Sequence, residues 1–302
     1  MRRFIILPVA AISLFLSGML APGSAAAQRD DALVLKPISV WSASYEHGRC
    51  LLTRSFGTPS SPHALVLEQR APGAKFNMIL TGSALSGIRE SGDVRITFGP
   101  VGYSADHAIA RDSSEKLGAL VYMQDVGIVS DEPADGSAGP SVEMGAPSFA
   151  IDTAAAKPLR QIAIAQGKQT LVFATGGLAA PLGVLNDCTA HILETWGLDP
   201  DAHRNAQRPA KVLDEKRVAR SIMESYPPRA VQEGSQGVVG VAIMVDEAGQ
   251  PTECKITRSS GHVELNAVSC KLLMKARYDP ALGADGQPIK SYWVTRISFR
   301  LG

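Results

Sequence analysis

The stretch Val238-Val-Gly-Val-Ala-Ile-Met-Val245 decides the fold of the C-terminal part of this chain. Val239, Val241, Ile243 and Val245 share one face under the period-two alternation of a β-strand. The turn-forming run Asp246-Glu-Ala-Gly249 follows at once, and a second strand-like run begins at Cys254. The stretch therefore predicts a pair of strands joined by a short turn.

A helix and a last strand are predicted after this pair. Residues at helical spacing form an apolar stripe between Gly261 and Arg277: Leu265, Val268, Leu272, Leu273 and Ala276. The last strand is predicted from Trp293 to Leu301. One face of it consists of Trp293, Thr295, Ile297, Phe299 and Leu301, and these alternate with Tyr292, Val294, Arg296, Ser298 and Arg300. Three strands with one helix on a single face predict a small two-layer α+β domain, in the order β-β-α-β.

The order of the motifs around these elements resembles the C-terminal domain of the TonB family. The shared features, in family order, are Tyr226-Pro227, Gly237-Val238, Gly249, Ser259-Ser260-Gly261, Leu265-Asn266 where Leu-Asp is usual, Tyr278-Asp279-Pro280-Ala281 and Asp285-Gly286. The resemblance implies a non-enzymatic protein that takes up the TonB box, a short extended segment of TonB-dependent outer-membrane receptors, as an added strand. In that family, strand addition supports energy-dependent uptake of siderophores or cobalamin.

The resemblance also implies where a partner binds. We expect the last strand, residues 292 to 300, to be the accepting edge, with Arg296 and Arg300 placed to meet acidic or polar receptor residues. The expected partner-binding residues are Tyr226, Pro227, Tyr292, Val294, Arg296, Ser298 and Arg300. A solvated face that limits aggregation is the alternative role for either arginine alone.

Residues 1–27 have the pattern of a targeting segment. Arg2 and Arg3 precede the apolar run Phe4–Leu20, and Ala25-Ala26-Ala27 supplies a cleavage pattern. We favour a cleaved export signal; an uncleaved inner-membrane anchor is the alternative, because the run approaches the length that spans a bilayer. Either case predicts a periplasmic protein. Energy transducers of the TonB family couple to inner-membrane motor proteins through a histidine in the membrane anchor and carry a long Pro-rich spacer. The apolar run of this chain has no histidine, and no Pro-rich spacer follows it, so coupling to the motor proteins is not expected.

The four cysteines are expected to form structural disulfides, because the compartment is oxidising. Four cysteines allow three pairings. The expected division of the chain leaves one pair in each domain, which favours Cys50 with Cys188 and Cys254 with Cys270. Their spacing suits no zinc motif, and neither a metal nor a cofactor is expected.

Residues 28–200 predict a mainly antiparallel β domain that ends in a helix. Short strands are expected at 32–41, 49–56, 63–69, 76–81, 94–98 and 169–174, with an undecided element at 113–123, a loop at 130–147 and a helix at 178–196. Leu182, Leu185 and Cys188 lie on the apolar face of that helix. Residues 201–213 have the composition of a linker, and residues 214–302 complete the chain as the TonB-like domain.

Other functional classes find little support. A formal net charge of +1 gives no case for nucleic-acid binding, and no catalytic constellation stands out. The loop Gly82–Gly87 lacks the Gly-x-Ser-x-Gly spacing of a nucleophile elbow. The alternative function is that of a soluble periplasmic binding or scaffold protein, whose TonB-like domain serves for docking or homodimerisation.

Overall fold

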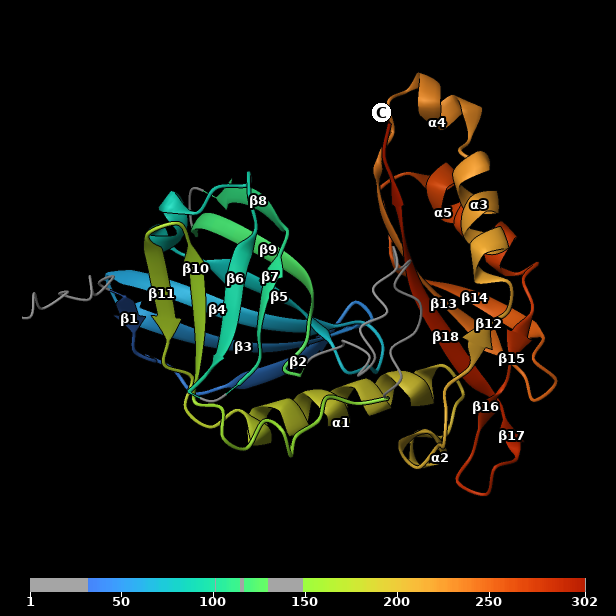
Figure 1. The fold of residues 1–302 in the computed structure, drawn as a ribbon, viewed down its shortest axis with the longest axis horizontal. Helices are drawn as coiled ribbons and strands as arrows, with labels where there is room; N and C mark the ends of the chain where they lie inside the picture. The colour runs from blue at the N-terminus through green and yellow to red at the C-terminus, as the bar shows by residue number, and fades with distance from the viewer. Residues whose placement is uncertain (1–31, 101, 115–116, 130–148, 302) are drawn as a thin grey trace, which may run out of the picture.

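The computed structural model describes residues 32–100, 102–114, 117–129 and 149–301. The export segment and the loop predicted at 130–147 lie outside the described residues. Two bodies stand side by side: a β-sandwich drawn in blue to lime, and a C-terminal module drawn in orange to red (Figure 1). The fold is α+β, as the sequence predicts.

The larger sheet of the sandwich has six strands, all antiparallel, in the order β2-β3-β4-β5-β9-β8. Their bounds are β2 Ser42–Glu46, β3 Arg49–Thr58, β4 Ser61–Gln69, β5 Phe76–Thr81, β8 Ile109–Ser114 and β9 Gly118–Val126. Alternate residues of β3, β4 and β5 are buried, and they include Leu52, Leu67 and Met78. This alternation leaves one face of the sheet for the core.

The second sheet has five strands in the order β1-β11-β10-β6-β7. Their bounds are β1 Leu33–Leu35, β6 Val94–Gly99, β7 Ser104–His107, β10 Gln161–Gln166 and β11 Gln169–Phe173. Rings from the two sheets meet edge to face, Phe56 with Phe173 at 5.2 Å and Phe76 with Phe98 at 6.4 Å between centroids. One core cluster therefore joins both sheets into a sandwich.

Several predicted strands need correction. The strand expected at 32–41 ends at Leu35, because Pro37 lacks an N–H for the ladder; Pro37 forms only an isolated bridge with Phe56 of β3, and the next strand, β2, begins at Ser42. The β domain is mainly antiparallel, as expected; it consists of two sheets, in one of which β1 runs parallel to β11. The undecided element at 113–123 is the strand pair β8 and β9. The loop at 82–87 contains a short 3-10 turn, η1 Ser83–Gly87.

Helix α1, Ala179–Thr195, runs beside β2 and β3 and ends next to the C-terminal module (Figure 1). Leu182, Leu185 and Ile192 are buried on its inner face, as their spacing predicts. The Cys50–Cys188 disulfide joins this helix to β3 and spans 138 residues of sequence. The helix is thus held on the sandwich covalently as well as by apolar packing.

The C-terminal module has a three-stranded antiparallel sheet in the order β14-β13-β18, with helices on one face. The bounds are β13 Gly237–Val245, β14 Pro251–Arg258, α5 Val263–Leu273 and β18 Ser291–Phe299. Shorter elements complete it: α2 Pro200–Arg204, β12 Lys211–Val212, α3 Glu215–Glu224, α4 Pro228–Gln232, β15 Tyr278–Asp279, β16 Ala281–Leu282 and β17 Pro288–Ile289. The Cys254–Cys270 disulfide joins β14 to α5.

This module keeps the predicted β-β-α-β order and adds to it. Helix α3 begins only at Glu215, because Lys211 and Val212 before it pair with β15. The segment 201–213, predicted as a linker, contains α2 and β12. None of the helices in the described ranges combines the length and the apolar character needed to cross a bilayer.

Candidate functional site

Strand β18 forms one edge of the three-stranded sheet, and among the described strands it pairs with β13 alone. The direction of its main-chain groups follows from β13. The carbonyl of Met244 accepts from the Thr252 hydroxyl on the β14 side, at 3.3 Å. Because main-chain groups alternate along a strand, those of Ile243 point the other way, toward Trp293 of β18.

The same alternation then sets the outer edge of β18. Trp293, Thr295 and Ile297 turn their N–H and C=O groups toward β13. The residues between them, Tyr292, Val294, Arg296 and Ser298, direct their main-chain groups to the outer edge. These four belong to the set predicted to bind a partner, so the main chain, rather than any one side chain, defines the candidate site.

The other predicted residues lie around the end of β18. The Tyr226 ring packs edge to face on Phe299, with 5.3 Å between centroids, and its hydroxyl donates to the Ser235 carbonyl. Pro227 caps α4 in an extended conformation. The side chains of Ser298 and Arg300 are exposed. Tyr226 and Pro227 thus fix how the chain enters the module.

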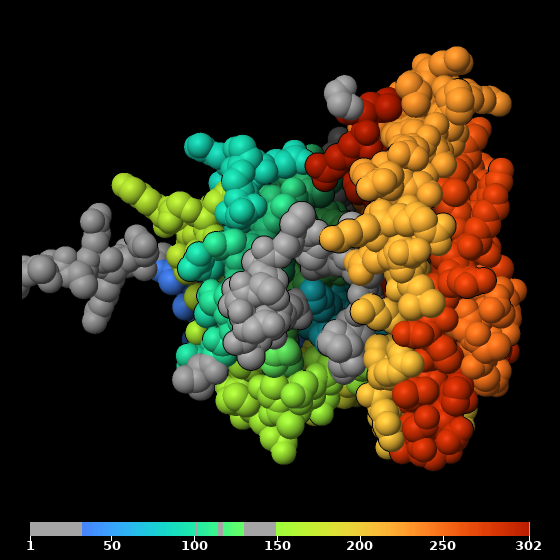
Figure 2. All heavy atoms as spheres, turned by 45° about the vertical axis from the view of Figure 1, so that its right-hand side comes forward, coloured from blue at the N-terminus to red at the C-terminus, as the bar shows by residue number. Residues whose placement is uncertain are grey.

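The sheet face opposite the helices is covered by the sandwich. Ala242, Met244 and Tyr292 are buried in a cluster with Leu193 and Leu198, which come from the end of α1 and the turn after it. The Tyr292 hydroxyl donates to the Pro72 carbonyl at 3.3 Å, and burial raises the pKa of this phenol. The space-filling view shows the module standing beside the sandwich as a slab (Figure 2). Helices therefore cover one face of the sheet, and the sandwich covers the other.

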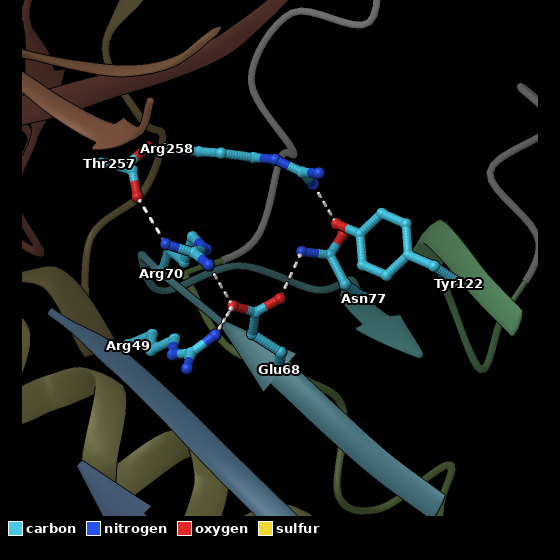
Figure 3. Close-up of polar contacts among 7 residues, drawn as sticks. All are labelled: Arg49, Glu68, Arg70, Asn77, Tyr122, Thr257 and Arg258. Atoms are coloured by element: carbon cyan, nitrogen blue, oxygen red, sulfur yellow. Dashed lines mark hydrogen bonds and ion pairs between the residues drawn. The ribbon is translucent and has the colours of Figure 1, made fainter. Parts of the chain in front are cut away.

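A polar cluster crosses the interface between the two bodies at the C-terminal end of β14 (Figure 3). Glu68 is almost fully buried and accepts from Arg70 at 2.6 Å and from Arg49 and Asn77 at 3.5 Å. The other terminal nitrogen of Arg70 donates to the Thr257 carbonyl of β14 at 3.0 Å. Arg70 therefore links a buried carboxylate of the sandwich to the main chain of the module.

Replacement of Glu68 by glutamine should destabilise the protein. The change leaves the guanidinium groups of Arg49 and Arg70 without their carboxylate, and we expect a loss of about 2–3 kcal/mol in the free energy of unfolding, measured in urea. Glu253→Gln is the matched control, because its partner Lys255 lies in an exposed ion pair worth at most about 0.5 kcal/mol. Equal losses in the two variants would contradict the role given to Glu68.

Two arginines of the C-terminal sheet, Arg258 and Arg296, contact strand β9 of the sandwich. Arg258 and Arg296 both lie opposite Gly240 in the strand register. Arg258 donates to the Tyr122 hydroxyl, and its guanidinium carbon lies 4.9 Å from the centroid of that ring. Arg296 forms an ion pair with Asp125, and burial lowers the pKa of its guanidinium. A Cβ at position 240 would come within 2.8 Å of Thr257 Oγ1, so only glycine fits between the arginines.

His203 lies buried where the chain passes from the sandwich to the module. Its Nδ1–H donates to the Asp199 carbonyl at 2.6 Å, and its Nε2 lies 3.0 Å from Ser291 Oγ at the start of β18. The rings of Phe149 and Tyr292 pack on the imidazole. Burial lowers the pKa of His203, and the Asp199 carbonyl bond and carboxylate charge oppose that shift only in part.

The stability of the protein should therefore fall in mild acid. Between the lowered pKa of folded His203 and the ordinary value of about 6.5, the unfolded chain binds a proton that the folded chain does not. Stability is complete above that window and is lost as the pH falls through it, at up to about 1.4 kcal/mol per pH unit. His63, whose pKa burial also lowers, acts in the same direction.

Urea unfolding at pH 7.5 and 5.5 measures this loss. The His203→Gln variant should lose part of the dependence and retain the part due to His63. An unchanged dependence in His203→Gln would show that His203 is not the group responsible.

The imidazole of His63 has a structural role. Its Nδ1 lies 3.1 Å from the Ser61 carbonyl, and its Nε2 accepts from the Ala84 N–H at 3.0 Å. Both ring nitrogens are thus bound to the main chain, which leaves neither to activate Ser61 or Ser83. Across the described residues, no group of three or more His, Cys, Asp or Glu side chains is arranged to hold a metal ion.

The geometry defines a class: a two-layer module with helices on one face of its sheet and an edge strand that, among the described strands, pairs on one side only. Residues 223–301 match the family model described as Gram-negative bacterial TonB protein C-terminal. This part of the chain therefore carries a TonB C-terminal domain, and that domain family is associated with transport. No curated protein and no solved structure matches the chain.

Sequence reasoning missed the contribution of the sandwich to this site. Tyr122, Asp125 and Glu68 carry no local signal that points to the C-terminal module. A hint was present in β18, where Tyr292 and Val294 are large and apolar on the face that a free module would expose to water.

Proposed function

We propose that this chain is a periplasmic TonB-like protein that binds TonB-dependent outer-membrane receptors by adding their TonB box to the outer edge of β18. The observation that carries the proposal is the direction of the main-chain groups of Tyr292, Val294, Arg296 and Ser298, which point away from β13. Strand addition uses such groups for affinity and leaves specificity to side chains. In this proposal the chain supports siderophore or cobalamin uptake by receptor binding.

The covered sheet face changes how this function is tested. A fragment limited to residues 214–302 would expose Met244, Tyr292 and Val294 and would associate through them. The mature chain from Gln28 is therefore titrated with peptides that contain receptor TonB boxes, and binding is followed by calorimetry. Complex formation with at least one such peptide is expected; if no peptide binds at concentrations up to the millimolar range, the proposal fails.

A scaffold function is the second candidate, and the contact between module and sandwich favours it. The sandwich holds the module in one position, as a docking platform would, through Arg70, Tyr122 and Asp125. Chromatography coupled to light scattering, together with N-terminal sequencing of the periplasmic and membrane fractions, separates the two candidates. A soluble mature start at Gln28 with no peptide binding would favour the scaffold.

A further inference from the structure

We propose that the sandwich captures the free C-terminus of an apolar peptide in a cleft beside β1. This site lies at the end of the sandwich away from the C-terminal module, and the inference does not depend on strand addition at β18 (Figure 1). The cleft lies between β1, the hairpin of β3 and β4, and η1. Its volume of about 520 Å³ is within the range of ligand sites, about 300–1,000 Å³.

The main-chain groups of Val34 point into this cleft. The Leu35 carbonyl accepts from the Ala174 N–H at 3.0 Å, so the main-chain groups of Leu35 are directed to β11. Those of Val34 and Lys36 point the other way, and the Lys36 carbonyl accepts from the Gly57 N–H at 2.8 Å. Among the described strands β1 pairs with β11 alone, so the N–H and C=O of Val34 are open to an extended ligand.

The walls of the cleft are mainly apolar. The side chains of Leu33 and Val34 are 48% and 52% exposed, so a ligand can reach them. Leu35 and Ala84 add apolar surface at the same cleft. An apolar side chain of a ligand would be removed from water against these residues, which favours a peptide whose last residues are apolar.

A lysine and a pair of hydroxyl groups provide for an anion in the cleft. Lys36 lines the cleft with an exposed side chain, and among the described residues its ammonium forms no ion pair. The Ser61 and Ser83 hydroxyls lie 3.1 Å apart. Because one of them donates to the other, one O–H of the pair is left to donate to a ligand. A carboxylate complements this set of donors.

A peptide C-terminus uses all of these groups together. Its last residue can donate its N–H to the Val34 carbonyl and accept from the Val34 N–H with its carboxylate, which also meets the Lys36 ammonium. A carboxylate on an alkyl chain would use the ammonium and the apolar walls but would leave the main-chain groups of Val34 without a partner. The combination therefore points to a peptide rather than to a fatty acid.

Peptides with matched ends test this inference. The mature chain from Gln28 is titrated by calorimetry, at low salt, with N-acetylated tetrapeptides that end in valine, leucine or phenylalanine. We expect a free carboxylate to bind about tenfold more tightly than the same peptide with a C-terminal amide. Methylation of the last amide nitrogen should weaken binding about threefold or more, because it removes the donor to Val34. Decanoate, which has no amide, should bind more weakly than the peptides.

Variants of the protein place the bound peptide. Lys36→Gln should remove most of the preference for a free carboxylate, and Leu33→Ser should weaken binding of both forms. The control Lys216→Gln changes an exposed lysine of α3 in the module and should have no effect. Val294→Pro, which alters the edge of β18, should also leave this binding unchanged. Circular dichroism verifies that each variant is folded.

Several results would overturn the inference. They are the absence of binding up to millimolar peptide, equal affinity for the carboxylate and the amide, tighter binding of decanoate, or loss of binding in Val294→Pro but not in Lys36→Gln. Light scattering covers one more case: a dimer of the free protein that Leu33→Ser dissociates would give the cleft to a second copy of the chain. None of these results bears on whether a TonB box adds to β18, so the two proposals fail separately.

Discussion

Proline at position 294 should weaken the binding of a TonB-box peptide by about tenfold or more. The N–H of Val294 points to the outer edge of β18, so Val294→Pro removes a donor that an added strand would use and places the pyrrolidine ring in its path. The lost hydrogen bond alone accounts for about 0.5–1.5 kcal/mol, and the steric conflict adds to it. The pairing of β18 with β13 does not use this N–H, so the sheet should survive.

The opposite edge of the same sheet provides the matched control. Ile256 of β14 is 38% exposed, and the alternation that turns Met244 toward β14 directs the N–H of Ile256 to the outer edge of that strand. Ile256→Pro therefore makes the same chemical change at the other edge. Calorimetric titration of both variants, with circular dichroism to verify folding, should show weaker binding only in Val294→Pro. Weaker binding only in Ile256→Pro would assign the accepting edge to β14.

Removal of the Cys50–Cys188 disulfide should have the largest effect on stability. The bridge spans 138 residues of sequence, whereas Cys254–Cys270 spans 16. In the chain-entropy model these loops correspond to about 5 and about 3 kcal/mol of stabilisation. A loss of 5 kcal/mol is comparable to the entire stability of many domains. The bridge also holds α1, whose end covers Met244 and Tyr292.

The two double variants, Cys50→Ala with Cys188→Ala and Cys254→Ala with Cys270→Ala, are compared by urea unfolding. The first should unfold at the lower urea concentration and should also expose the interface between sandwich and module, detected by binding of a hydrophobic dye. The second should lose less stability and keep the interface closed. The reverse order of stability would contradict a loop-length origin for these contributions.

Much of the C-terminal module could be predicted from the sequence because its signals are local. The period-two pattern of residues 237–245 and 293–301 and the helical stripe around Leu265 and Leu273 reappear in β13, β18 and α5. Less could be predicted in the sandwich. Strands β2 and β10 were missed, and β1 was predicted too long, because short strands with mixed polarity give weak periodic signals.

The sequence by itself determined which residues of β13, β18 and α5 share a face, and it favoured the cysteine pairing that the structure has. The tertiary structure alone decided what covers the second face of the β13–β18 sheet. Periodicity states that Tyr292, Val294 and Arg296 point the same way, but it carries no information about which distant surface they meet. That surface is Pro72, Tyr122, Asp125 and the end of α1, brought there by the fit of shape and charge between segments far apart in the chain.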